Sequence, residues 1–134
     1  MKPKILLVGT KNDLRWEKIV RNAATKLKHS LDVVSNTEID SVKSWHECEL
    51  VILDSSDVST LSIIISAIRS RSFDVPIVVI SPAPGWQEAK EALKAGAVDY
   101  QLKSSREKDI LNVLKNNLKK SPSPTIHRIE GVKQ

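Results

Sequence analysis

Short apolar segments rich in β-branched residues alternate along this chain with stretches whose apolar residues have helical spacing, and this alternation constrains the fold more than any other feature. The predicted strands are residues 4–9, 31–34, 49–54, 76–81 and 99–102. Strands separated by helices need right-handed crossovers, so we expect an α/β fold with a mostly parallel sheet and helices on both faces. Near-continuous apolar runs at residues 5–8, 50–53 and 77–80 are typical of central strands that are covered on both sides.

The helical stretches differ in clarity. The first has Asp13 as a cap and one apolar face, made of Trp16, Ile19, Val20, Ala23, Ala24 and Leu27. Residues 38–45 predict only a short helix. Two further helices are predicted at residues 60–71 and 86–95, and Gly96 is a stop signal directly after the second. A last helix opens with Ser104 and Glu107 in capping-box spacing and is expected to bury Leu111, Leu114 and Leu118.

A length of 134 residues predicts one domain, residues 1–120, and a Ser/Pro-containing tail or linker, residues 121–134. With 40% hydrophobic and 28% charged residues the chain reads as a soluble globular protein. No apolar run approaches the roughly 20 residues of a membrane-spanning helix, and the amino terminus does not resemble a signal peptide. We therefore expect a cytoplasmic protein. Its single cysteine, Cys48, reads as a small buried hydrophobe.

Charge and motifs leave two alternative functions open. The net charge of +5 suggests a nucleic-acid-binding module, but Lys and Arg are spread along the chain, aromatic residues make up only 4%, and no binding motif is present. A small nucleotide- or flavin-binding protein of the same architecture would need a glycine-rich first turn, and residues 8–12 contain only Gly9. The three histidines are too scattered to predict a metal site.

Reactive side chains stand where the predicted strands end. The third strand ends in Asp54, the fourth in Ser81, and Lys103 follows the fifth. Because the carboxyl ends of parallel strands lie at one edge of a sheet, where ligands of such folds bind, we expect this acid, hydroxyl and amine to converge.

These segments resemble the receiver domain of response regulators over nearly all of residues 4–118. The matches are Lys-Ile-Leu-Leu-Val at 4–8, Glu-Leu-Val-Ile-Leu-Asp at 49–54, Pro-Ile-Val-Val-Ile-Ser at 76–81 and Ala-Gly-Ala-Val-Asp-Tyr-Gln-Leu-Lys at 95–103. The resemblance implies a flavodoxin-like, doubly wound five-stranded sheet of order 2-1-3-4-5 and a role in two-component signalling or a phosphorelay, without enzymatic activity. It also implies that Asp54 accepts a phosphoryl group from a histidine kinase, that Ser81 and Lys103 contact this group, and that Tyr100 is the switch aromatic.

The chain departs from the receiver pattern at the metal site. Gly9 and Thr10 stand where receivers carry two acidic residues that hold Mg²⁺, so we expect weak Mg²⁺ binding and no other cofactor. Asp13 and Asp57 lie nearby in sequence, but they read better as a helix cap and a loop residue than as substitute ligands. Ser104 and Val58 replace prolines that the family usually has. These changes predict an atypical receiver that acts largely through protein contacts.

Partners are expected to be a histidine kinase or a downstream signalling protein. The expected contact face combines the helix at 86–95, the strand at 99–102 and the last helix, and a homodimer through this face is one option. Its predicted polar residues are Lys90, Lys94, Asp99, Tyr100 and Arg106. Trp86 begins a helix close to Ser81, so we expect its side chain to cover the pocket at the strand ends.

Overall fold

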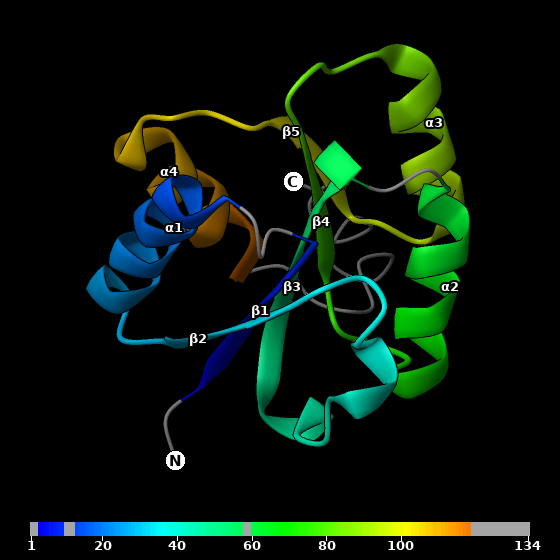
Figure 1. Cartoon of the computed structure of the whole chain (residues 1–134), viewed down its shortest axis with the longest axis horizontal. Coiled ribbons are helices and arrows are strands. Elements are labelled where there is room, and N and C mark those ends of the chain that lie inside the picture. The colour runs from blue at the N-terminus through cyan, green and yellow to red at the C-terminus, as the bar shows by residue number, and fades with distance from the viewer. Residues whose placement is uncertain (1–2, 10–12, 58–59, 119–134) are drawn as a thin grey trace, which may run out of the picture.

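A five-stranded, all-parallel sheet forms the centre of the molecule (Figure 1). The computed structural model describes residues 3–9, 13–57 and 60–118. The strands are β1 (Lys4–Val8), β2 (Ser30–Val34), β3 (Cys48–Asp54), β4 (Ile77–Ser81) and β5 (Asp99–Leu102), and their order in the sheet is β2-β1-β3-β4-β5. The predicted fold class, strand positions and strand order are confirmed.

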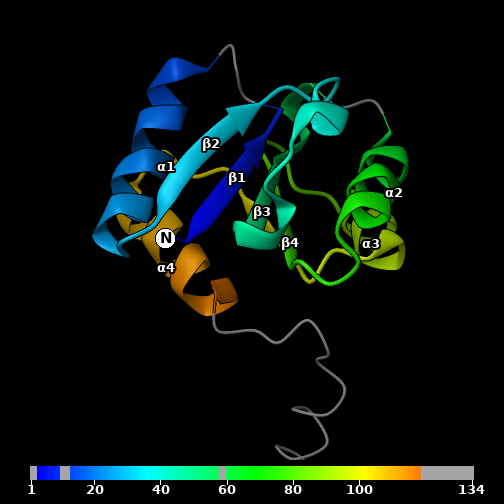
Figure 2. The same ribbon diagram turned by 90° about the horizontal axis from the view of Figure 1, so that it is seen from below.

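Four helices cover the two faces of this sheet in pairs. In Figure 2, α1 (Leu14–Lys26) and α4 (Glu107–Leu118) lie on one side, and α2 (Leu61–Arg71) and α3 (Trp86–Ala95) lie on the other. Successive side chains of a strand point to opposite faces, so a strand covered on both sides must be apolar at every position. In β1, Ile5 and Leu7 pack under α1 and α4, whereas Leu6 and Val8 pack under α2 and α3. The three predicted central strands are buried in this way.

The first and second long helices form as predicted. The carboxylate of Asp13 accepts a hydrogen bond from the backbone N–H of Trp16 and caps α1. In α2, Leu61, Ile65 and Ile68 are buried, and Ile64 packs at the edge of the same core. The helical spacing of these residues therefore decided the structure in spite of their β-branched side chains.

The prediction of a helix at residues 38–45 is wrong. This connection contains two short 3₁₀ turns, Ile39–Ser41 and Trp45–Glu47, separated by Val42 in an extended conformation. Only Ile39 of these turns is buried. A segment that buries one apolar residue gains too little from packing to offset the cost of starting a helix.

The start of the last helix also differs from the prediction. α4 begins at Glu107, and the hydroxyl of Ser104 accepts from the N–H of Arg106 and donates to Asp109, so no capping box with Glu107 forms. Glu107 instead forms an ion pair with Lys26 of α1. The buried apolar residues of α4 are Ile110 and Leu114, while Leu111 and Leu118 are half-buried. The spacing was right, but the buried face is turned by one residue.

The remaining expectations about the chain ends and the membrane have separate outcomes. The tail at 121–134 lies outside the described residues. Among the helices that the structure describes, none combines the length and the apolar character needed to cross a bilayer. Cys48 is buried as predicted, and burial raises the pKa of its thiol to about 11.

Candidate functional site

The amino group of Lys103 lies between two carboxylates at the carboxyl edge of the sheet. Its Nζ is 2.8 Å from Oδ2 of Asp54, at the end of β3, and 2.9 Å from Oδ2 of Asp13, which caps α1. A third bond, 3.2 Å long, runs to the hydroxyl of Ser56. Residues that are 49 positions apart thus meet as predicted from the strand ends, and Asp13 joins them. The sequence had favoured a capping role for Asp13 over that of a substitute metal ligand, and had not indicated a bond to Lys103.

Asp54 is enclosed by the residues around it. Its side chain is 1% exposed, and its Oδ1 accepts hydrogen bonds from both the backbone N–H and the hydroxyl of Ser56, at 2.9 and 2.6 Å. Its Oδ2 faces Lys103. Both oxygens of the predicted acceptor are therefore bonded to the protein itself.

Charge pairing changes the acidity of the groups around Asp54. The hydrogen bond from Lys103 is the largest of the effects that lower the pKa of Asp13, followed by the bond from the Trp16 N–H. Desolvation alone would lower the pKa of Lys103, but its bonds to Asp54 and Asp13 outweigh this effect and raise the pKa above its ordinary value. The site therefore holds Lys103 as a cation and Asp13 as an anion.

Trp16 forms the floor beneath this ion-pair cluster. Its ring centroid is 4.8 Å from Nζ of Lys103, within the range of a cation–π contact, and the ring is almost completely buried. The indole N–H donates to the carbonyl of Ser104, 88 positions away, which anchors the loop that follows Lys103. The helical spacing of Trp16 predicted only a packing role for this residue, so the contact with Lys103 was missed.

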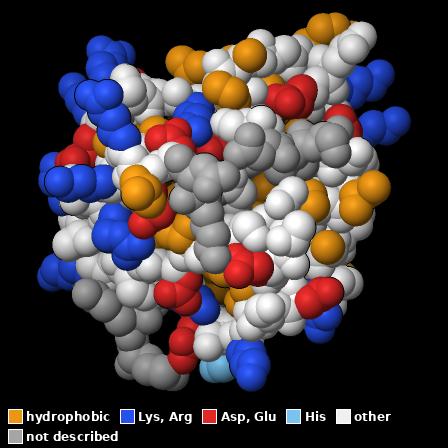
Figure 3. Space-filling model, viewed as in Figure 1, with side chains coloured by type: hydrophobic (Ala, Val, Ile, Leu, Met, Phe, Trp, Pro, Cys, Tyr) orange, Lys and Arg blue, Asp and Glu red, His pale blue; other side chains and the backbone are white. Residues whose placement is uncertain are grey.

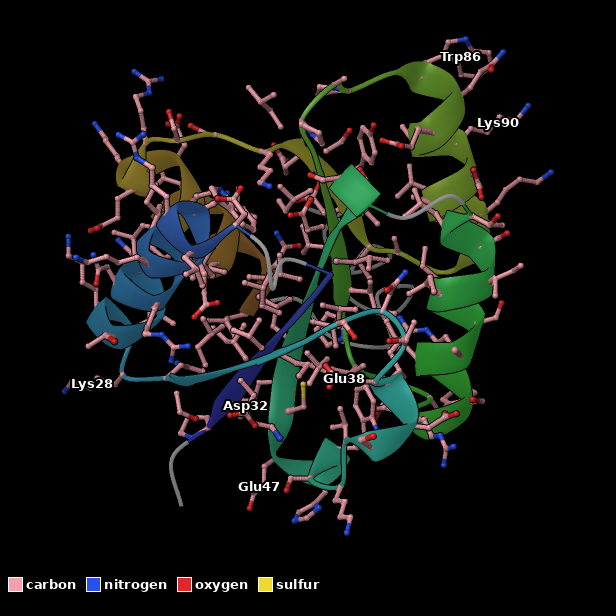
Figure 4. All side chains as sticks on the ribbon, viewed as in Figure 1. Lys28, Asp32, Glu38, Glu47, Trp86 and Lys90 are labelled. Atoms are coloured by element: carbon pink, nitrogen blue, oxygen red, sulfur yellow. The ribbon has the colours of Figure 1, made fainter. Side chains whose placement is uncertain are left out.

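Trp86, which was expected to cover the pocket, does not do so. Its side chain is 72% exposed and lies under Lys90, whose Nζ is 5.3 Å from the ring centroid. Figure 4 shows both side chains pointing outward from α3, away from the sheet. The residue starts α3 as predicted, but the helix turns its first residue toward solvent, so the expectation was wrong.

Ser81 and Tyr100 lie at the same edge with partners of their own. Ser81 is 2% exposed, its hydroxyl accepts from the N–H of Ala83, and its carbonyl accepts from the N–H of Lys103. The hydroxyl of Tyr100 donates to Glu88 of α3 and accepts from the N–H of Gly85. Glu88 also accepts from Ser55, the neighbour of Asp54, and so links Tyr100 to the acceptor strand.

The metal site that the receiver resemblance implies does not fit these residues. Gly9 has φ +99°, and a Cβ at this position would lie 2.8 Å from the backbone oxygen of Asp54, so the turn has no room for an acidic side chain. Thr10 and the side chain of Asp57 lie outside the described residues. Within residues 3–9, 13–57 and 60–118 no group of three His, Cys, Asp or Glu side chains is placed to hold a metal ion. Asp13 and Asp54 direct their oxygens at an ammonium group instead.

A cavity of about 530 Å³ gives access to Lys103 from the side of α1. It is lined by Asp13, Arg15, Trp16, Ile19, Pro82, Lys103 and Ser105. A larger hollow, of about 790 Å³, lies around Trp45, Phe73 and Leu118 and touches none of the predicted site residues. Because the smaller cavity contains Lys103 and Asp13, it is the better candidate for a binding site. Asp54 is not among its lining residues.

Comparison with known proteins identifies the fold. No family model and no curated protein matches the sequence. Solved structures do match: the non-phosphorylated HemR receiver domain from Leptospira biflexa (21% identity, TM-score 0.73) covers 88% of this chain and 95% of its own. A response regulator from Thermotoga maritima matches with 23% identity and a TM-score of 0.67, over 88% of this chain and 98% of its own. A response regulator receiver domain protein from Methanospirillum hungatei matches with 14% identity and a TM-score of 0.71, over 88% of this chain and 94% of its own. The chain has the receiver fold.

Sequence identities of 14–23% show a shared fold, and the chemistry of the site depends on the side chains at its strand ends. Within the receiver fold Asp54 and Lys103 stand at the strand ends that the sequence indicated, with Ser81 on the strand between them. Ser56 and Trp16 were missed. An aspartate followed two positions later by serine is a common turn pattern, and this signal could have revealed the bond between Ser56 and Asp54.

Proposed function

We propose that this chain is a receiver-type domain of a two-component or phosphorelay system, and that it signals mainly through protein contacts. One observation carries the proposal: Lys103 and Asp54, distant in sequence, form a 2.8 Å ion pair at the carboxyl edge of a receiver-fold sheet. A buried ion pair is costly to assemble and is a weak source of stability, which favours a functional reason for its presence. Receiver domains are in general signalling domains, and we propose no enzymatic reaction for this chain.

The surroundings of Asp54 support contacts over phosphorylation. Attack on a phosphoryl donor requires a carboxylate oxygen that faces the donor in line. Here one oxygen is held by Ser56 and the other by Lys103, and the side chain is 1% exposed. Phosphorylation of Asp54 would have to break one of these bonds. It would also lack the two acidic residues after β1 that receivers use for Mg²⁺.

If Asp54 does accept a phosphoryl group, this chain supplies two of the parts that stabilise it. The Lys103 ammonium is already within bonding distance of Asp54, so it can neutralise charge on the phosphoryl oxygens. The Ser81 hydroxyl lies on the neighbouring strand and can donate to another oxygen.

The proposed contact face is formed by α3, β5 and α4, and it is more apolar than the sequence indicated. Besides the charged residues Lys90, Lys94 and Arg106, it exposes Trp86, Leu93 and Leu102, which are 72%, 49% and 54% exposed. Large exposed apolar side chains next to charged ones are typical of protein interfaces. We propose that a histidine kinase, a downstream signalling protein or a second copy binds here.

In Figure 3 most Lys and Arg side chains lie on the left, the side of α1 and α4, with acidic side chains among them, so this face carries no continuous basic surface. This distribution lends no support to the nucleic-acid alternative, which would favour a continuous basic surface. The flavin or nucleotide alternative predicts a visible or near-ultraviolet absorbance of the purified protein. Such an absorbance would contradict the proposed function.

Amide chemical shifts test the role of Asp54. We would record them for the wild type and for Asp54→Asn, with Mg²⁺ alone and with Mg²⁺ plus beryllofluoride, a phosphoryl mimic. A contact-only receiver shows no shifts centred on Asp54, Ser81 and Lys103. Shifts that appear in the wild type and vanish in Asp54→Asn would overturn the contact-only part and establish a working phosphoacceptor.

A further inference from the structure

We propose that the Lys103 ammonium is the resident cation of this site, taking the place of a divalent metal, and that Asp13 is the residue that positions it. The inference deepens the proposed function by stating how the site is held together. Its role in signalling rests on the proposed function, whereas the contacts of Lys103 with Asp13 and Asp54 do not depend on that function.

The ammonium of Lys103 has a complete set of protein partners. It can donate three hydrogen bonds, and three acceptors lie within reach: Asp54 at 2.8 Å, Asp13 at 2.9 Å and Ser56 at 3.2 Å. The Trp16 ring covers a further side, and the Lys103 side chain is only 11% exposed. A cation removed from water to this degree needs such a shell of partners.

Lys103 and a metal ion would compete for the same oxygens. Two carboxylates that face each other repel, and some cation must lie between them. Here Oδ2 of Asp13 and Oδ2 of Asp54 both point at the same nitrogen. A Mg²⁺ ion would have to displace Lys103 from these atoms and then remain beside its positive charge. The site is therefore built for an internal cation.

Asp13 holds Lys103 through one oxygen while its other oxygen caps a helix. Oδ1 accepts from the N–H of Trp16 at 3.1 Å, which fixes the carboxylate at the start of α1. Oδ2 is then aimed at Lys103. A single side chain thus ties α1 to the strand end that carries Asp54, which makes Asp13 a positioning residue.

Removing the cation tests the inference. In Lys103→Met the two carboxylates lose their shared partner, and we expect Tm to fall by about 10 °C. Millimolar Mg²⁺ should then bind between them and restore about 4 °C, whereas the wild type should not respond to Mg²⁺. Lys90→Met is the matched control, since Lys90 is an exposed lysine that also lies over a tryptophan. It should show neither effect.

A second variant separates positioning from capping and does not require Lys103→Met to fold. Asp13→Ser keeps a good helix cap but removes the negative charge. We expect the ¹⁵N resonance of the Lys103 ammonium to shift and its pKa to fall in this variant, while the Lys90 resonance stays unchanged.

Two results would overturn the inference. One is an unchanged Lys103 ammonium resonance in Asp13→Ser. The other is a wild type that Mg²⁺ stabilises as much as it stabilises Lys103→Met. Neither measurement involves a partner or a phosphoryl donor, so a failed signalling assay would count against the proposed function alone.

Discussion

Replacing Gly9 with alanine should destabilise the protein strongly, although only one methyl group is added. Gly9 directly follows β1 and has φ +99°, a conformation that residues with a side chain rarely adopt. The added Cβ would also lie 2.8 Å from the backbone oxygen of Asp54, closer than such atoms approach one another in proteins. Either the turn or the end of β3 must move.

The size of the effect follows from these two contributions. Holding a non-glycine residue in this backbone region costs about 1–3 kcal/mol, and forcing atoms into a packed site costs a further 1–3 kcal/mol or so. Alanine recovers roughly 0.5–1 kcal/mol by restricting the unfolded chain. The net loss is about 3 kcal/mol in the free energy of unfolding, or about 10 °C in Tm for a domain of this size.

Urea denaturation of Gly9→Ala and Gly85→Ala measures this difference. Gly85 is the matched control, because it has an extended backbone and a Cβ there meets no atom within 4 Å, so its substitution should change stability by less than about 1 kcal/mol. Equal stability of Gly9→Ala and the wild type would refute the close approach of this turn to Asp54. Gly9→Asp should be at least as unstable as Gly9→Ala, so an acid introduced here does not rebuild a metal site.

Three further predictions concern acidity, reactivity and contacts. Because folding lowers the pKa of Asp13, its contribution is present above its unfolded value of about 3.8 and is lost as the pH falls through the folded pKa, so stability measured against pH should decline less steeply there in Asp13→Ser. With a pKa of about 11, Cys48 is roughly one-thousandth thiolate at pH 8, so iodoacetamide should modify it only after unfolding, and fast modification of the native protein would contradict its burial. If a second copy covers the α3–β5–α4 face, Trp86→Ala should weaken self-association in sedimentation velocity, and a wild type that stays monomeric at millimolar concentration would exclude the homodimer.

The pattern of apolar residues was sufficient to predict the sheet and most helices. Central strands such as β1 are apolar along their covered part, residues 5–8 in β1, because both of their faces are packed against helices, and this requirement is visible in the sequence. The meeting of Asp54 and Lys103 was also predictable, since all carboxyl ends of a parallel sheet lie at one edge. Prediction failed at residues 38–45, where little apolar surface fixes the backbone and local patterns are ambiguous.

Sequence alone determined which residue types stand at the strand ends: glycine where receivers have an acid, then Asp54, Ser81 and Lys103. The tertiary structure alone decided which partners these residues take. It placed Asp13 against Lys103, put Trp16 and not Trp86 beside the ammonium, and closed Ser56 over Asp54. Periodicity specifies which face of an element is buried, whereas a contact between side chains depends on how elements from distant parts of the chain are turned and packed against one another.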